Sequence, residues 1–307
     1  MVKFKIITDS SCGITQEEAT RYGIKVLPLT LHYKQKDYLD GIDISTDDFY
    51  GLLFESSEKK DLKNLIFNSE KKEFPKTSQV PPLEFKKAFE ECIENHEIPI
   101  VLPIASVLSG TYQSACIARD MLEDKEIYVI DSKTALGCLK IMIMSLQQKK
   151  FETIDDVLKE IDYMIQHIAF YSVPDTLEYL YKGGRLSKTS AVLGNLLQLK
   201  PIIKLSEVGK LEPIAKVRGL KHAFMKIADA VKEEPIDTNY PVDFGFSNHI
   251  ENVEELKGYL KDFLPDEYTT TQISPVVGAH VGPGASAIFY ISVSYTHLRA
   301  HETSLHL

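Results

Sequence analysis

Two loops rich in small hydroxyl side chains hold the residues of this sequence best suited to chemistry. The first carries Thr77 within the stretch 74–79, FPKTSQ, and the second is 106–115, SVLSGTYQSA. The second loop follows an apolar run and opens a helix, which is where an α/β sheet binds ligands. The free N–H groups of a first helical turn suit an anion, and Ser and Thr add donors. The pattern predicts a small site for one anionic or polar group, and ordinary helix capping by Ser109 or Thr111 is the alternative.

Two further polar loops follow predicted strands. Asp9 and Ser10 come after an apolar stretch at 4–7, and an Asp-Ser-Lys-Thr loop at 131–134 comes after another at 127–130. Because Asp9 and Ser10 lie at the carboxyl end of a strand, they could line a crevice. Capping of its own loop is the simpler interpretation of Asp9.

Motifs for nucleotide and nucleophilic chemistry are missing. No GxxxxGK[ST] run is present, and the stretch 184–189, GRLSKT, lacks the second Gly before its Lys. Ser109 does not lie in a G-x-S-x-G elbow, because Val107 occupies the place of the first Gly. His301 and Glu302 begin a zinc-like pattern, but the next His does not have the HExxH spacing. These absences favour binding over turnover, and they predict no metal site.

The composition is that of a soluble globular protein. The chain has 307 residues, of which 44% are hydrophobic and 26% charged, and its net charge is −9. An acidic balance disfavours a nucleic-acid backbone or an anionic membrane as partner, and no apolar tract approaches the length of a membrane span. The four Cys form no CxxC pair, which suits free thiols in a reducing cytosol. Since the N-terminus is no signal peptide, we expect a cytoplasmic protein with no integral membrane association.

The first half of the chain alternates strand and helix patterns, as a parallel sheet requires. Thr15 and Glu18 form a capping box for the first helix. Residues 31–38 alternate and then meet Asp40-Gly41, which predicts a hairpin-like excursion. Residues 55–73 are rich in Lys, Glu and Ser, which indicates a solvated surface insertion. We expect strands at 4–7, 24–29, 98–104 and 127–130, and helices at 15–21, 45–54, 82–95, 111–122 and 136–148.

The second half holds more strand-to-strand steps, so we expect a mixed sheet there. Asp175 caps a helix ending at Gly183-Gly184, Arg185 opens the next helix through Leu199, and 278–284 is a glycine-rich loop before a last strand. We expect strands at 168–173, 201–205, 213–218, 242–246, 269–273 and 287–291, and helices at 153–167, 219–232 and 253–263. The predicted domains are 1–150, a parallel α/β unit with both hydroxyl loops, and 151–291, a mixed α/β unit, followed by an atypical tail at 292–307.

Ordered motifs across residues 3–291 resemble the DegV family of bacterial fatty-acid-binding proteins. Each motif alone is weak, but their order along the whole chain is specific. The resemblance rests on ITDSS at 7–11, FPKTSQ at 74–79, LSGTYQSA at 108–115, VIDS at 129–132, LYKGGRLS at 180–187, KPI at 200–202 and GAHVGPG at 278–284. It implies two α/β domains with a long-chain fatty acid between them, the carboxylate on hydroxyls of the two loops and the acyl chain in an apolar tunnel.

The resemblance also implies roles for individual residues. Thr77 and Ser109 are the expected carboxylate ligands. His280, in a motif that resembles the family's H-x-G-P-G loop, is the third, unless it serves loop geometry alone. Arg185 either closes the head-group site, meets a partner, or is a solvated residue at a helix start. The neighbours expected around the head group are Ser78, Ser106 and Thr111.

In some members of the family the protein is the carrier subunit of a bacterial fatty acid kinase. The resemblance therefore implies presentation of the acyl carboxylate to a separate ATP-binding kinase subunit, giving acyl phosphate for phospholipid synthesis. The chain would then be a binding protein and not an enzyme, with a fatty acid as ligand and no cofactor. The alternative is an enzyme or binding protein for a small polar or phosphorylated substrate, because the fold is thought to resemble the substrate-binding part of dihydroxyacetone kinases. A third possibility is a regulatory protein whose lipid is only structural.

Overall fold

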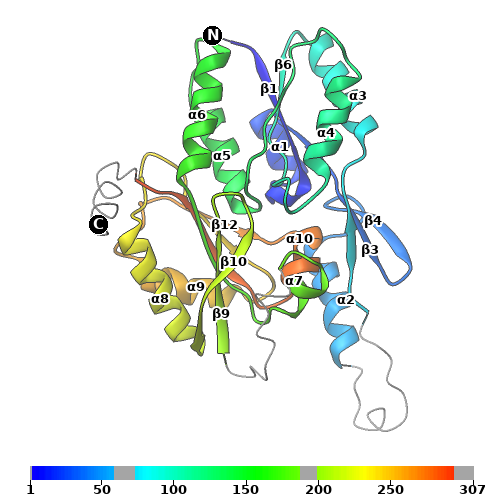
Figure 1. Ribbon diagram of the computed structural model, residues 1–307. Coiled ribbons are helices and arrows are strands. Elements are labelled where there is room, and N and C mark those ends of the chain that lie inside the picture. Colours follow the sequence, from blue (N-terminus) through cyan, green and yellow to red (C-terminus); the bar gives the residue numbers. More distant parts are fainter. Residues whose placement is uncertain (1, 59–72, 187–198, 294–307) are drawn as a thin grey trace, which may run out of the picture.

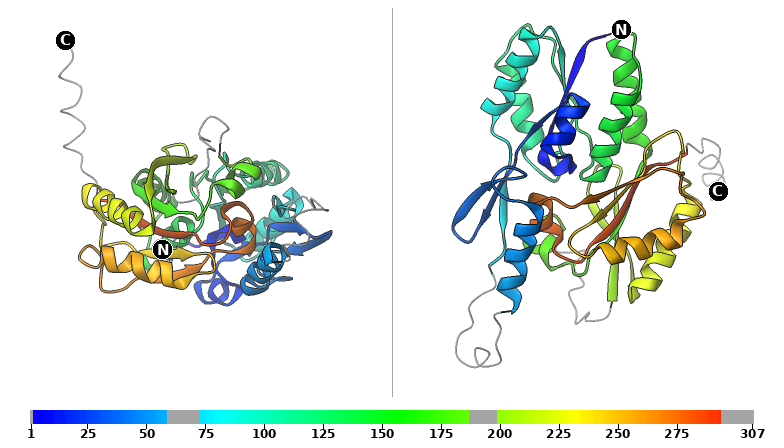
Figure 2. Two further views of the ribbon diagram at one scale, coloured as in Figure 1. Left: turned by 90° about the horizontal axis from the view of Figure 1, so that it is seen from below. Right: turned by 180° about the vertical axis from the view of Figure 1, so that it is seen from behind.

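The computed structural model describes residues 2–58, 73–186 and 199–293 of the chain. They form two main β-sheets with helices packed on them, and a small third sheet that projects from one side (Figure 1; Figure 2, right). The predicted α/β class, with one parallel and one mixed sheet, is confirmed. All four Cys are buried and free. No helix within the described ranges is long and apolar enough to cross a membrane.

The N-terminal sheet is parallel, with the order β2-β1-β6-β7. The predicted capping box of Thr15 and Glu18 is present at the start of its first helix. Strand β2 lies on one side of β1, and β6, the next strand of this sheet along the chain, lies on the other side. The crevice of the sheet therefore lies between the carboxyl ends of β1 and β6. The elements are β1 (Phe4–Asp9), the 3-10 turn η1 (Ser10–Cys12), α1 (Gln16–Tyr22), β2 (Lys25–Leu27), α3 (Pro82–Glu94), β6 (Ile98–Val101), α4 (Thr111–Asp120) and β7 (Tyr128–Val129).

The C-terminal sheet has the order β10-β9-β8-β13-β11-β12. The pair β11–β12 is parallel, and the other neighbouring pairs are antiparallel. Alternate side chains face opposite sides: Tyr171 and Tyr290 pack with α8 and α9, whereas Phe170 and Phe289 pack with α5. The elements are β8 (Ile168–Val173), β9 (Leu199–Leu205), β10 (Leu211–Arg218), α8 (Leu220–Glu233), β11 (Asp243–Phe246), α9 (Ile250–Leu260), β12 (Thr269–Gln272) and β13 (Ser286–Ile291).

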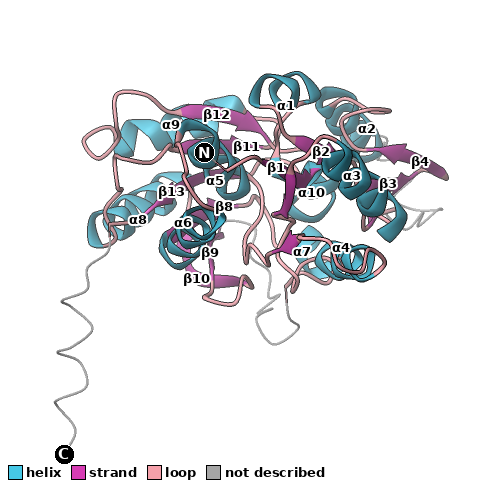
Figure 3. Ribbon diagram, turned by 90° about the horizontal axis from the view of Figure 1, so that it is seen from above, coloured by secondary structure: helices cyan, strands magenta, loops and turns pink. Residues whose placement is uncertain are grey.

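Helix α5 (Gly137–Gln148) lies between the two halves, with α6 (Ile154–His167) beside it (Figure 3). Its residues from Gly137 to Leu146 are all buried. A Cβ at Gly137 would overlap the ring of Phe289 on β13, so glycine lets the helix approach the sheet closely. Lys140 of α5 binds both Glu18 of α1, at 3.2 Å, and Thr271 of β12, at 2.9 Å. The predicted division at residue 150 remains a prediction.

The small antiparallel sheet has the order β4-β3-β5 and comprises β3 (Thr30–Tyr33), β4 (Lys36–Leu39) and β5 (Lys76–Ser78). The predicted hairpin is present, but it turns at Lys34 and Gln35, both with positive φ, rather than at Asp40-Gly41. Strand β5 was not predicted from the sequence, because three residues are too few to show a period. The remaining helices are α2 (Thr46–Glu58), α7 (Glu178–Lys182) and α10 (Pro275–Val281).

Three expectations near the site were wrong. The stretch 278–284 is not all loop, since α10 runs to Val281 and carries His280; Pro275 at its first position is a typical helix start. Leu199 begins strand β9 instead of ending a helix. Asp175 pairs with Lys200, and the start of α7 is held instead by Thr176, whose Oγ1 accepts from the Glu178 N–H.

Some expectations fall outside the described residues. These are residues 187–198 of the helix expected over 185–199, residues 59–72 of the insertion expected over 55–73, and residues 294–307 of the tail expected from 292 onward. Helix α2 continues to Glu58, beyond its expected end. At the C-terminal edge, Ser292 N–H donates to the His167 carbonyl and Val293 N–H to the Pro235 carbonyl, both at 2.8 Å.

Candidate functional site

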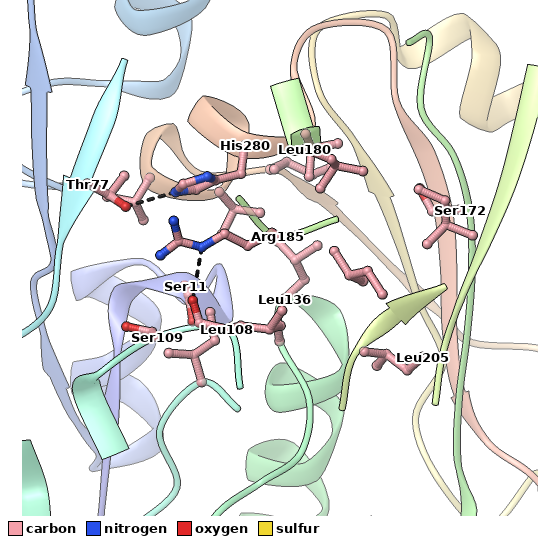
Figure 4. Close-up of a pocket in the computed structure, with 18 of the residues that line it drawn as sticks. Ser11, Thr77, Leu108, Ser109, Leu136, Ser172, Leu180, Arg185, Leu205 and His280 are labelled. Atoms are coloured by element: carbon pink, nitrogen blue, oxygen red, sulfur yellow. Dashed lines mark hydrogen bonds between the residues drawn. The ribbon is translucent and has the colours of Figure 1, made fainter. Parts of the chain in front are cut away.

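A largely apolar pocket lies between the β1–β6 crevice and the α5-facing side of the mixed sheet (Figure 4). Its space, including the mouth that is open to solvent, is about 870 Å³. One end is polar and the other is apolar. The polar end is lined by Ser11, Thr77, Ser109, Arg185 and His280. The apolar wall includes Leu29, Leu136, Phe170, Leu180, Ile203, Leu205, Leu211, Val276 and Val277, with Ser172 among them.

Asp9 holds the two crevice loops together. Its Oδ1 accepts from the backbone N–H of Ser11 at 3.0 Å and from the Ser11 hydroxyl at 2.5 Å, and its Oδ2 accepts from Ile104 N–H at 2.7 Å. Burial raises the pKa of Asp9, and these hydrogen bonds oppose that rise. Asp9 therefore caps its loop, as the simpler interpretation had it, and the side chain that reaches the pocket is Ser11.

Thr77 and His280 come together from opposite ends of the chain. Thr77 lies on β5 and His280 on α10, and Thr77 Oγ1 is 2.8 Å from His280 Nε2. Burial and the nearby Arg185 lower the pKa of His280 to about 4, so the ring is neutral near neutral pH. Its Nδ1 is buried and has no hydrogen-bond partner among the described residues.

Arg185 brings a positive charge to the polar end. Its Nε donates to the Leu108 carbonyl at 3.0 Å and one terminal nitrogen donates to the Gly183 carbonyl at 2.5 Å. Burial lowers the pKa of Arg185, yet a guanidinium stays protonated in proteins. No carboxylate in the described part of the chain pairs with it. A guanidinium has five N–H donors, and those that have no partner among the described residues can be offered to an anion.

The hydroxyl groups of Ser109 and Thr111 are hydrogen-bonded to each other, but only Ser109 reaches the pocket. Their hydroxyl oxygens are 2.9 Å apart, and Ser109 Oγ accepts from the Thr111 N–H at 3.3 Å. Thr111 is fully buried behind Ser109 and does not line the pocket. Ser109 thus serves the first turn of α4 and also faces the pocket. Its role as a ligand for an anion stays a prediction.

Two of the expected neighbours point elsewhere. Ser78 follows Thr77 on a strand and therefore faces the opposite side, where its Oγ is 2.6 Å from His32 Nε2. Ser106 is exposed, its N–H and hydroxyl both donating to the Asp131 carboxylate. Neither lines the pocket.

Most of the apolar wall could not be predicted from the sequence. Phe170, Ile203 and Leu205 lie on strands buried on both faces, which read as continuous apolar runs and do not reveal which side chains face a cavity. Ser172 is a polar exception, whose hydroxyl donates to the Ser286 carbonyl at 3.1 Å. No group of three His, Cys, Asp or Glu side chains suited to a metal ion occurs in the described ranges.

Known proteins match this chain along nearly its whole length. A family model described as "Uncharacterised protein, DegV family" matches residues 3–293. A DegV domain-containing protein of Caldanaerobacter subterraneus is 35% identical over 94% of this chain and 99% of its own. A Thermus thermophilus structure described as fatty acid binding of a DegV family protein has a TM-score of 0.82 and 25% identity, covering 95% of this chain and all of the other. A fatty acid binding DegV family protein from Streptococcus agalactiae has a TM-score of 0.79 and 27% identity, covering 96% and 100%.

Proposed function

The chain belongs to the DegV family, and from that premise we propose that its pocket binds one long-chain fatty acid. The observation that carries this proposal is Arg185, a partly buried cation without a carboxylate partner in the described residues, at the polar end of an otherwise apolar pocket. A fatty acid has the same division into an anionic head and an apolar chain. The related Thermus and Streptococcus structures are described as fatty-acid-binding proteins.

The head group is placed by groups of different kinds. Arg185 supplies the positive charge, while the Thr77 and Ser109 hydroxyls supply neutral hydrogen bonds. His280 is neutral near pH 7, because its pKa is lowered to about 4, and it therefore orients Thr77 rather than adding charge. A carboxylate that accepts a charge-assisted bond from a guanidinium is held in a defined orientation.

The acyl chain provides most of the affinity. Burying about fifteen methylenes at about 0.8 kcal/mol each gives on the order of 12 kcal/mol, before the costs of association and of ordering the ligand. What remains is compatible with micromolar or tighter binding. The head-group bonds then fix orientation more than they add affinity. The apolar lining also favours a lipid over the small polar substrate considered as the alternative.

The further role that we propose is that of a carrier for a separate ATP-binding fatty acid kinase subunit. The loop that lines the head-group end includes Val107, which is 45% exposed next to the pocket residue Leu108. The carboxylate would therefore lie beneath a surface loop, where a partner could reach it. The test is to mix the lipid-loaded chain with such a kinase subunit and ATP, and to trap acyl phosphate with hydroxylamine. Absence of hydroxamate, with a known carrier active in parallel, would contradict this role.

The binding proposal is tested by mass spectrometry of organic extracts from protein purified without added lipid. We expect roughly one fatty acid per chain, whose identity reports the preference of the apolar wall. An empty protein that also fails to take up palmitate or oleate would overturn the proposal. Small phosphorylated and polyol ligands would then be the next candidates.

A further inference from the structure

Asp40 is a buried carboxylate outside the pocket that touches the segments forming its polar end. It directly follows strand β4, and its side chain is almost fully buried. Its backbone N–H donates to the Leu29 carbonyl at 2.9 Å, and Leu29 N–H donates to Ser10 Oγ at 3.1 Å. Its Oδ1 accepts from Val276 N–H at 3.3 Å. Asp40 therefore joins the small sheet, the turn η1 and the helix α10.

Each of these three segments carries a residue of the polar end. Turn η1 places Ser11, next to Ser10, in the pocket. Helix α10 carries Val276 and, one turn later, His280. Strand β3 of the small sheet pairs Leu31 with Thr77. A shift of α10 relative to the small sheet would change the distance between Thr77 and His280.

The surroundings of Asp40 do not compensate its charge. Among the described residues, the titratable groups that face it are Asp9, Cys12 and Tyr50, and none of these is a cation. Burial raises the pKa of Asp40 to about 6, with a further rise from Asp9, while the Val276 N–H opposes it. Asp40 Oδ2 and Ser274 Oγ each have no hydrogen-bond partner among the described residues. The carboxyl group can therefore change its charge, and with it the strength of its bond to α10, near neutral pH.

We propose that Asp40 is a positioning residue for the head-group end of the pocket, whose carboxylate holds helix α10 and so keeps His280 against Thr77. The inference rests on the proposed fatty-acid function of that pocket. When the carboxylate takes up a proton, it loses the charge that strengthens its bond to Val276 N–H and gains an O–H that Ser274 Oγ can accept. Acidification then loosens α10 and weakens the alignment of His280 with Thr77.

The experiment compares the native protein with Asp40→Asn and Asp40→Ala, and uses Asp37→Asn as the matched control. Asp37 lies on the same hairpin with its side chain 74% exposed, away from the pocket. The first readout is the ring ¹⁵N signal of His280, assigned by its loss in His280→Gln, followed from about pH 7.5 to about pH 5. The second is the affinity for hexadecanol, an uncharged ligand whose own ionisation cannot contribute to a pH dependence.

We expect a step in the native His280 signal with a midpoint near pH 6, and the same step in Asp37→Asn. Asp40→Asn, which keeps a neutral acceptor for Val276 N–H, should bind within about threefold of native and lose the step. Asp40→Ala should displace the signal at every pH and weaken hexadecanol binding about tenfold. A step that persists in Asp40→Asn overturns the inference, as do a native signal and native affinity in Asp40→Ala.

If Asp40→Ala does not fold, the Asn variant alone decides the inference. The two proposals also fail in different ways. A protein that takes up no fatty acid but shows an Asp40-dependent His280 step contradicts the proposed function and supports the positioning role. A protein that is loaded with fatty acid but lacks that step supports the proposed function and contradicts the positioning role of Asp40.

Discussion

Thr77 Oγ1 and His280 Nε2, 203 residues apart in the chain, lie 2.8 Å from each other across the polar end of the pocket. Because His280 is neutral at neutral pH, one of its nitrogens carries the single proton. A buried N–H without a partner is rarer in proteins than an unfilled acceptor, and Nδ1 has no partner among the described residues. We therefore assign the proton to Nε2, which donates to Thr77 and leaves the Thr77 O–H free to donate to a ligand.

A double-mutant cycle on this pair tests the assignment. Thr77→Val and His280→Gln should each weaken palmitate binding by about tenfold. The affinity of the double variant for palmitate should be only slightly lower than that of the single variant that binds palmitate less tightly. The reason is that both changes break the same chain of hydrogen bonds to the carboxylate. Isothermal titration calorimetry on delipidated protein measures the palmitate affinity of the native protein, the two single variants and the double variant. Strictly additive losses would show that the two residues act independently.

Arg185 is expected to recognise charge rather than shape. Arg185→Gln should weaken palmitate binding by about tenfold or more, since it removes a charge-assisted hydrogen bond, while binding of hexadecanol should change little. Arg185→Lys should restore only part of the loss, because an ammonium cannot match the guanidinium fork. Competition assays measure the ratio of the palmitate affinity to the hexadecanol affinity in each variant. An equal loss for acid and alcohol would place Arg185 in a structural role.

The lowered pKa of His280 predicts that acid destabilises the delipidated protein through this residue. The unfolded chain takes up a proton near pH 6.5, whereas the folded protein does so only near pH 4. The free energy of unfolding should therefore fall by about 2 kcal/mol between pH 7 and pH 5 because of His280 alone. Asp40, with its raised pKa, acts in the opposite direction over the same range.

Urea titrations at both pH values separate the two residues. The difference in unfolding free energy between the native protein and His280→Gln should change by that amount between the two pH values, since Asp40 is common to both. A difference that is independent of pH would contradict the lowered pKa.

Features that follow from the spacing of residues close together in the chain could be predicted from the sequence. The pocket could not, because it brings together side chains from distant segments. The capping box at Thr15, the amphipathic helix α3 and the parallel sheet follow from local spacing and were predicted. The pocket end that faces Thr77 depends on α10, whose last turn lies in the glycine-rich stretch 278–284 that predicts a loop. Ser78 and Ser106 have the right residue type for the head-group site, but strand alternation and the Asp131 carboxylate direct them away from it.

The apolar wall sets the length of chain that the pocket accepts. Leu205 on β9 lines the end far from Thr77 (Figure 4). Leu205→Trp should fill that end, reducing the affinity for palmitate by at least about tenfold while a ten-carbon acid binds nearly as before. Val208→Trp, at a site that is 52% exposed, is the control. Equal losses for both acids would indicate a general disturbance of the sheet.

Gly183 is expected to be required because His280 occupies the space beside it. A Cβ at this position would overlap His280 Nδ1 and would come within 3.1 Å of the Tyr179 carbonyl oxygen. Since the ring is buried and bonded to Thr77, Gly183→Ala should push it out of place, with a loss of about 1–3 kcal/mol in unfolding free energy and weaker palmitate binding. Gly258→Ala is the matched control: it lies inside helix α9 with open space around it, and it should stabilise the protein by about 0.5–1 kcal/mol. Thermal unfolding and palmitate titration of both variants measure the effect, and a Gly183→Ala protein that is as stable as native and binds equally well would show that His280 has room to move.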